Sequence, residues 1–165
     1  MNQEQRMAFV RTHRTAIYGF NRKNDGPAMS VVYYLMDGED ILISTMEGCG
    51  KAKVLRRNPK ASLCVLDEQW PLTYLQVYGD ATIDATADTD LEKVTDLLMR
   101  ILGLMVGKAM PESVREQTRQ MALAERRVQL RVCPYATFES PPRHVYSSED
   151  VADLTHDLGL HLPWK

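Results

Sequence analysis

Regular alternation of apolar and polar residues in YLQVYGDATI, residues 74–83, is the feature that most constrains the fold of this chain. Two sets of side chains alternate there: Leu75, Val77, Gly79, Ala81 and Ile83 against Tyr74, Gln76, Tyr78, Asp80 and Thr82. Because successive side chains of a β-strand point to opposite faces, the pattern predicts a strand with one buried face.

Other segments are rich in β-branched and aromatic residues and are also expected to be strands: 15–21, 28–35, 40–45, 61–67 and 126–140. Asp37 and Gly38 stand between two of these runs, which is a hairpin signal. Antiparallel hairpins with one apolar face favour a mainly β fold with inserted helices, namely a six-stranded antiparallel barrel that is closed or partly split.

Two helices are expected before the last strand. The first begins near Thr89, which has capping-box spacing to Glu92, and its apolar residues recur at helical spacing: Leu91, Val94, Leu98, Ile101 and Met105. Pro111 suits the first turn of a second helix that ends near Glu125. A short leading helix is expected over residues 1–14. No linker or repeat divides the chain, so residues 1–165 are predicted to form a single domain with this helical pair inserted at about 89–125.

The segment that follows Ser140 contains SPPRH and LHLPWK and is open to two interpretations. It is either a loosely packed arm or an arm that reaches a partner.

Charge and composition exclude several classes of function. The formal charge is −2 and the pI is about 6.1, whereas a general nucleic-acid binder usually carries a basic excess. The N-terminus lacks the apolar core of a signal peptide, and the most apolar run is interrupted by Arg100 and Lys108. We therefore expect a cytoplasmic protein without a membrane segment. The three cysteines and four histidines show no metal-ligand spacing, so no metal site is predicted.

One stretch, STMEGCGKAKVLRRNP (44–59), gathers basic residues behind two glycines in a slightly acidic chain. A strand is expected to end at Thr45, and a short helix to begin near Lys51. Unpaired backbone N–H groups at a helix start, a lysine ammonium and a threonine hydroxyl are suitable ligands for a phosphate. The alternative is a solvated basic helix without a ligand. The GxxxxGK[ST] pattern of a Walker loop is absent.

The stretch ILISTMEGCGKAKVLRRNPKASLCVLD (41–67) resembles the phosphate-binding strand–loop–helix of the pyridoxamine 5'-phosphate oxidase-like split-barrel superfamily. The resemblance extends back to DGPAMSVVYYLMDGEDI and forward to YLQVYGDATI and ERRVQLRV, so that it covers residues 14–139. Within that superfamily the chain is most similar to the B group of the flavin/deazaflavin oxidoreductases.

This resemblance implies a six-stranded split barrel that forms a homodimer, with two cofactor sites at the interface. The cofactor would be the deazaflavin coenzyme F-420, or FMN as in sister groups. Lys51 would bind its phosphate, helped by Gly50, Lys53 and Thr45. On the second strand, four residues would lie along the ring and its ribityl chain: Met29, Ser30, Val31 and Tyr33. Tyr74 and Gln76 would sit near the site, from the same subunit or from the other one.

The resemblance also implies the chemistry, which is hydride transfer to a small unsaturated organic substrate without a catalytic side chain. Two departures point away from vitamin B6 oxidation: Gly50 replaces an arginine, and the tail lacks the arginine segment of true pyridoxamine phosphate oxidases. Two alternatives remain open. One is an FMN-dependent reductase or oxidase, and the other is a non-catalytic protein that binds a flavin, a deazaflavin or haem.

Overall fold

The computed structural model describes residues 1–67, 69, 73–139 and 159–165. The elements follow one another along the chain as α1 (Gln3–Thr12), β1 (Thr15–Asn21), β2 (Pro27–Asp37), β3 (Asp40–Met46), α2 (Gly50–Val54), β4 (Lys60–Asp67), β5 (Thr73–Thr86), α3 (Leu91–Val106), the 3-10 helix η1 (Glu112–Val114), α4 (Arg115–Ala124), β6 (Arg127–Glu139) and β7 (Leu160–Pro163).

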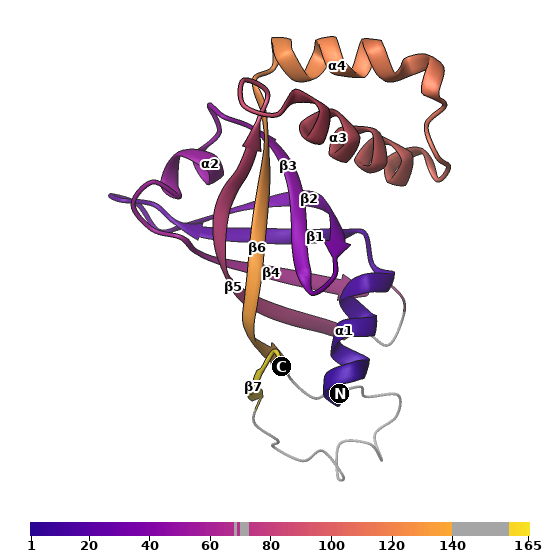
Figure 1. The fold of residues 1–165 in the computed structure, drawn as a ribbon. Helices are drawn as coiled ribbons and strands as arrows, with labels where there is room; N and C mark the ends of the chain where they lie inside the picture. Colours follow the sequence, from indigo (N-terminus) through magenta and orange to yellow (C-terminus); the bar gives the residue numbers. More distant parts are fainter. Residues whose placement is uncertain (68, 70–72, 140–158) are drawn as a thin grey trace.

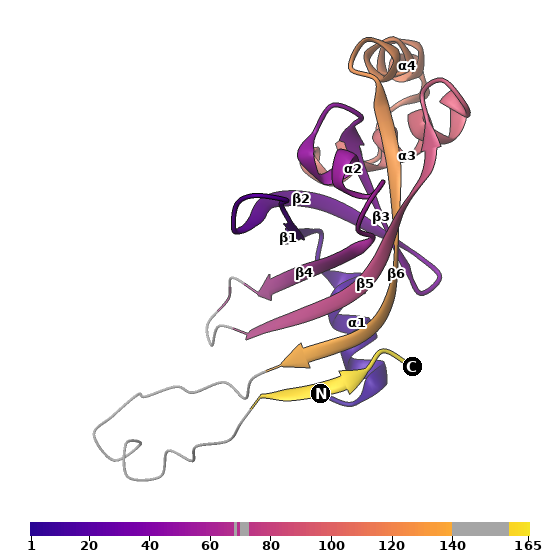
Figure 2. The same ribbon diagram turned by 90° about the vertical axis from the view of Figure 1, so that its left-hand side faces the viewer.

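The strands form one antiparallel sheet in the order β3-β2-β1-β4-β5-β6-β7, and β3 also pairs with β6. That pairing closes six strands into a barrel, which confirms the predicted fold (Figure 1). The side view shows β4, β5, β6 and β7 following one another down the barrel wall (Figure 2). The predicted hairpin at Asp37–Gly38 is also confirmed, because Asp37 pairs with Asp40 across a two-residue turn in which Gly38 has φ +62°.

The barrel interior is filled by side chains from β1 to β6. Among its most buried residues are Tyr18, Val32, Tyr34, Ile43, Leu63, Leu75, Val77, Leu130 and Val132. Strand β5 has the predicted alternation up to Ala81, and its pairing with β6 shifts at Tyr78/Gly79 and at Ile83/Ala85. Gly79 is required where these strands approach closely, because a Cβ there would lie 2.5 Å from Val132 Cγ1.

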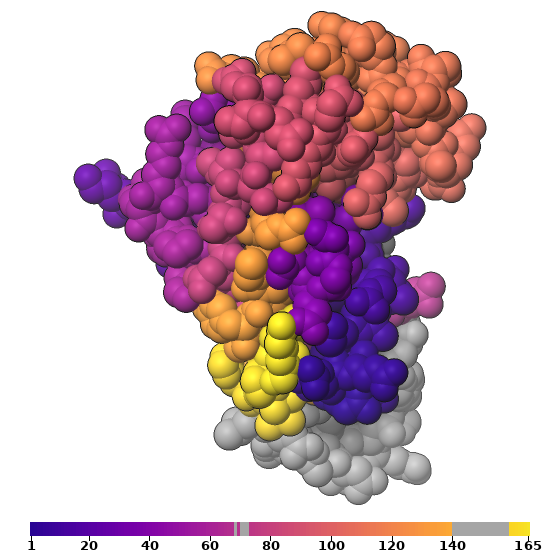
Figure 3. Space-filling model, viewed as in Figure 1, coloured from indigo at the N-terminus to yellow at the C-terminus, as the bar shows by residue number. Residues whose placement is uncertain are grey.

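Both termini pack against one end of the barrel. The hydroxyl of Tyr34 donates a hydrogen bond of 2.6 Å to the carbonyl of Val10, which lies in α1. Trp164 follows β7 and retains only 1% of its accessible surface. Arg6 of α1 donates to the carbonyl of Pro163 at 2.8 Å, and the C-terminal segment lies against α1 (Figure 3). A loosely packed arm is therefore wrong for residues 159–165, and β7 rather than β6 is the last strand.

The helical pair is confirmed, with two corrections. Asp90, and not Thr89, caps α3 by accepting a hydrogen bond from the backbone N–H of Lys93, while Thr89 bonds to Thr86. Met105 lies outside the buried stripe and is half exposed. The buried face of α3 packs against α4 through Val94 and Leu98, and against the β3 side chain Leu42 through Leu97 and Ile101.

None of the helices within the described ranges is both apolar enough and long enough to span a lipid bilayer.

Candidate functional site

Helix α2 packs against the end of β1. Ala52 and Val54 are buried, and a Cβ on Gly50 would lie 3.1 Å from the ring of Phe20. The helix has only five residues, and Cys49 caps it without a side-chain hydrogen bond. The predicted strand–loop–helix order is therefore present, and this short helix is anchored by its apolar side.

A cavity of about 210 Å³ lies between α2 and the turn that joins β1 to β2. Its lining includes Phe20, Arg22, Lys23, Asn24, Asp25, Gly50, Lys53, Val54 and Arg57. Arg22 is ion-paired with Asp25 at 3.2 Å, whereas Lys23, Lys53 and Arg57 have no carboxylate partner in the described part of the chain. The cavity is therefore cationic and suited to an anion.

Among the predicted phosphate ligands, the structure brings Gly50 and Lys53 together in this cavity but not Lys51 or Thr45. Residues two apart on a helix differ by about 200° in direction, so Lys51 projects from another side of α2 than Lys53 does. Lys51 is half-buried. Thr45 is buried, on the same side of β3 as the core residues Ile41 and Ile43.

The predicted residues of β2 divide between the two sides of the sheet. Met29 and Val31 retain 74% and 72% of their accessible surface on the outer side, which Tyr33 shares by alternation. Tyr33 packs against the cluster of Leu42, Leu97 and Ile101. Ser30 lies on the side of the core residue Val32, and its hydroxyl is buried without a hydrogen-bond partner among the described residues.

Strand register places Gln76 on the same outer row as Val31. Val31 pairs with Ile17, Ile17 with Cys64, and Cys64 with Gln76, so that the row crosses β2, β1, β4 and β5. Tyr74 shares the outer side of β5 by alternation. With strands about 4.8 Å apart, the row from Val31 to Gln76 spans about 14 Å. Burial raises the pKa of the Cys64 thiol, which keeps the centre of the row uncharged at neutral pH.

We call this surface the outer face: Ile17, Met29, Val31, Tyr33, Cys64, Leu66, Tyr74 and Gln76. It joins five of the predicted site residues to Ile17, Cys64 and Leu66, which sequence reasoning missed. Their alternation was visible in the sequence, but the register between strands was not. Arg22 and Lys23 were also missed, because their segment was interpreted only as a turn.

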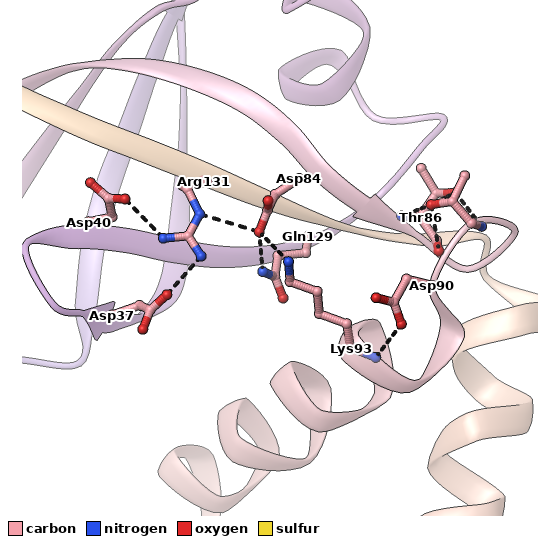
Figure 4. A network of polar contacts seen from close by, with 9 residues as sticks. Asp37, Asp40, Asp84, Thr86, Asp90, Lys93, Gln129 and Arg131 are labelled. Atoms are coloured by element: carbon pink, nitrogen blue, oxygen red, sulfur yellow. Dashed lines mark hydrogen bonds and ion pairs between the residues drawn. The ribbon is translucent and has the colours of Figure 1, made fainter.

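A network of polar side chains around Arg131 links neighbouring strands of the barrel (Figure 4). Arg131 on β6 donates to Asp40 at 2.9 Å, to Asp37 at 2.7 Å and to Asp84 at 3.3 Å. Partial burial opposes ionisation of Asp84, but hydrogen bonds from Lys93 and Gln129 and the charge of Arg131 lower its pKa overall. Each of the three carboxylates is paired with Arg131, so the cluster holds β2, β3, β5 and β6 together. We call it the Arg131 clamp. In the described ranges, no group of three or more His, Cys, Asp or Glu side chains is placed to hold a metal ion.

The fold is that of a known family. The family model described as pyridoxamine 5'-phosphate oxidase matches residues 3–131, and the chain belongs to this family. The observed barrel is accordingly a pyridoxamine 5'-phosphate oxidase-like split barrel. Among curated proteins, none matches the chain.

Solved structures share the fold. A conserved hypothetical protein, Rv2991 from Mycobacterium tuberculosis, is 19% identical with a TM-score of 0.69, covering 90% of this chain and 94% of that one. An F420 reductase is 18% identical with a TM-score of 0.58, covering 79% and 93%. A heme binding protein from Mycobacterium smegmatis is 9% identical with a TM-score of 0.63, covering 98% and 57%. At these identities the likeness establishes the fold alone.

Proposed function

We propose that this chain is a cytoplasmic oxidoreductase that uses coenzyme F-420 to transfer a hydride to a small unsaturated organic substrate. Membership of the family and the fold shared with an F420 reductase support this proposal. The observation that carries it is the outer face, because five residues expected at the cofactor from sequence share one side of the sheet there.

The residues present fit a flat, anionic cofactor. Val31 and Met29 are largely exposed apolar side chains, and burying them against an aromatic ring would remove that surface from water. Lys23, Lys53 and Arg57, which have no carboxylate partner among the described residues, match a phosphate and an acidic tail.

We assign the following roles to the chain's own residues. Lys51 binds the cofactor phosphate, and Gly50 and Lys53, which line the cavity, support it. Thr45 is buried on the core side of β3 and takes no direct part. Met29, Val31 and Tyr33 hold and orient the ring and its ribityl chain, while Tyr74 and Gln76 border it. Ser30, on the core side of β2, takes no direct part. The apolar side chains also exclude water from the reacting surface, which protects a hydride from loss to solvent.

A bound deazaflavin supplies the hydride carrier itself, so the chain needs no catalytic acid, base or nucleophile of its own. Its contribution is position and electrostatics. We expect the outer face to be covered by a second copy of the chain in a homodimer, because Val31 and Met29 are the most exposed of its large apolar residues. Tyr74 and Gln76 would then contact a cofactor held by the partner subunit or by their own.

The proposal is tested by following the oxidation of reduced F-420 with a panel of enones and quinones. Turnover with at least one of them, dependent on enzyme concentration, is the expected result. Binding of F-420 without turnover of any acceptor would instead indicate a carrier, and turnover with reduced FMN alone would indicate an FMN-dependent reductase or oxidase.

A non-catalytic haem-binding protein is the second candidate. The fold is shared with a heme binding protein, and His161 lies beside Tyr78 with ring centroids 5.8 Å apart. An imidazole can serve as an axial ligand for haem iron, and His161 is exposed. Addition of hemin would then give a sharp Soret band that is lost in His161→Ala, whereas an unchanged spectrum in that variant would exclude His161 as the ligand.

A further inference from the structure

A second and larger cavity, of about 860 Å³, lies against α3 and away from α2. Helix α3 from Asp96 onward and the segment from Gly107 to Glu112 form most of its wall. Arg14, just before β1, Leu35 of β2 and Arg115 of α4 complete it. Volumes of about 300–1,000 Å³ are typical of pockets that bind small molecules. None of the site residues assigned above lines this cavity.

The lining of this cavity is partly apolar. Leu35, Met99, Leu104 and Met110 contribute to it, and Met99 is buried while the other three are half buried. Gly103 lets the chain return closely after α3, because a Cβ there would lie 3.1 Å from the carbonyl oxygen of Lys108. The cavity can therefore remove the hydrocarbon body of a ligand from water.

The residues that line the cavity carry a net positive charge. Asp96 and Glu112 are the acidic residues of the lining, and both pair with Arg115, at 2.5 Å and 3.5 Å. Arg100 and Lys108 also line the cavity, and neither has a carboxylate partner in the ranges that the structure describes. The guanidinium of Arg14 is held by the carbonyl oxygen of Leu104 at 3.0 Å. Arg115 thus neutralises the two acids of the lining. The other three cations of the lining, Arg14, Arg100 and Lys108, have no carboxylate partner among the described residues.

We propose that this cavity is a binding site for amphipathic organic anions, molecules that carry one carboxylate on an apolar body. The carboxylate is held by Arg100 and Lys108 at the edge, and the body lies against Leu35, Met99 and Leu104. The site adjoins the proposed cofactor site, because Leu35 packs against the same cluster as Tyr33, but no residue assigned to the cofactor lines the cavity. Its test therefore needs no flavin or deazaflavin.

The test is a calorimetric titration of the full chain with decanoate, below its critical micelle concentration, and with 2-naphthoate. These two probes distinguish a linear body from a flat one. Decan-1-ol is the matched uncharged ligand. We expect at least one carboxylate to bind with one site per chain, about tenfold or more tightly than decan-1-ol. Equal binding of the acid and the alcohol, or binding of neither acid, would overturn the proposal.

Variants locate the site. Arg100 and Lys108 are exposed, so Arg100→Gln and Lys108→Gln should leave folding intact. Each is expected to weaken carboxylate binding about three- to fivefold, whereas the charge-matched control Arg56→Gln, on a well-exposed side chain paired with Glu47, should not change it. If all three variants bind like the wild type, or all lose affinity equally, the carboxylate does not bind in this cavity.

Discussion

Ile17 of β1 lies directly opposite Val31 of β2 on the outer face, and both side chains remain exposed in the single chain. Adjacent exposed apolar residues on a sheet face often mark a surface that binds a ligand or another protein. We expect a cofactor and a second copy of the chain to cover this pair.

Val31→Asp tests this directly. Because Val31 is largely exposed, the substitution should change the free energy of unfolding of the single chain by no more than about 0.5 kcal/mol. It should nevertheless shift the chain from dimer to monomer in sedimentation equilibrium. Leu123→Asp, on an exposed residue of α4, is the matched control and should not shift it. A wild-type chain that is monomeric at all concentrations, or a Val31→Asp dimer of unchanged affinity, would contradict the expected interface.

Trp164→Ala should be strongly destabilising, because the indole is almost fully buried in the barrel core. Replacing such a side chain by alanine costs about 3–5 kcal/mol, as measured by urea unfolding. Lys165→Ala, one residue further on and largely exposed, is the control and should have a small effect. Equal stability of the two variants would show that the tail is loose after all.

Gly79→Ala should destabilise the barrel by about 1–3 kcal/mol, since the new Cβ would lie 2.5 Å from Val132 Cγ1 and 3.0 Å from the carbonyl oxygen of Cys133. Gly48→Ala provides the comparison, because nothing lies within 4 Å of a Cβ there. Thermal unfolding of both variants gives the answer. A Gly79→Ala midpoint equal to that of Gly48→Ala would mean that β5 and β6 are not so closely packed.

The Arg131 clamp predicts a dependence of stability on pH. The pKa of Asp84 is lower in the folded chain than in the unfolded one, so its contribution is complete above the unfolded pKa and is lost as the pH falls through the folded pKa. Asp84→Asn should remove that contribution, which is on the order of 1 kcal/mol after solvent screening. Urea unfolding at neutral pH and at a series of pH values below 3.8 measures it. The difference in the free energy of unfolding between wild type and variant should be largest at neutral pH and should shrink steadily as the pH falls. A difference that does not change with pH would show that Asp84 does not contribute to the pH dependence.

Much of the fold was predictable from local sequence, and the reason is physical. The alternation in β5 and the Asp37–Gly38 turn each depend on a few neighbouring residues, and both are present in the structure as predicted. The burial of Trp164 was not predictable, because it depends on the strand just before it. That strand, β7, has only four residues and is held by its pairing with β6, which the local sequence does not specify. Met105 also departed from its predicted role: its helical spacing fits the stripe, but it lies near the end of α3, where it is half exposed.

The candidate site divides in the same way. Met29, Val31 and Gln76 were nameable from the resemblance, and their common face follows from the register of β2, β1, β4 and β5, which no single segment specifies. Arg22 and Lys53 lie far apart in the sequence and line one cavity only because α2 folds back onto the end of β1.

An equilibrium titration of F-420 and of FMN, followed by ligand fluorescence, is the decisive test of the proposed cofactor site. The wild type should bind F-420 more tightly than FMN. Lys51→Ala should weaken F-420 binding at least about tenfold, the loss expected for one charge-assisted hydrogen bond, while Arg11→Gln, on the distant helix α1, leaves it unchanged. No F-420 binding by the wild type, or equal affinity for the wild type and Lys51→Ala, would contradict the assignment of this site.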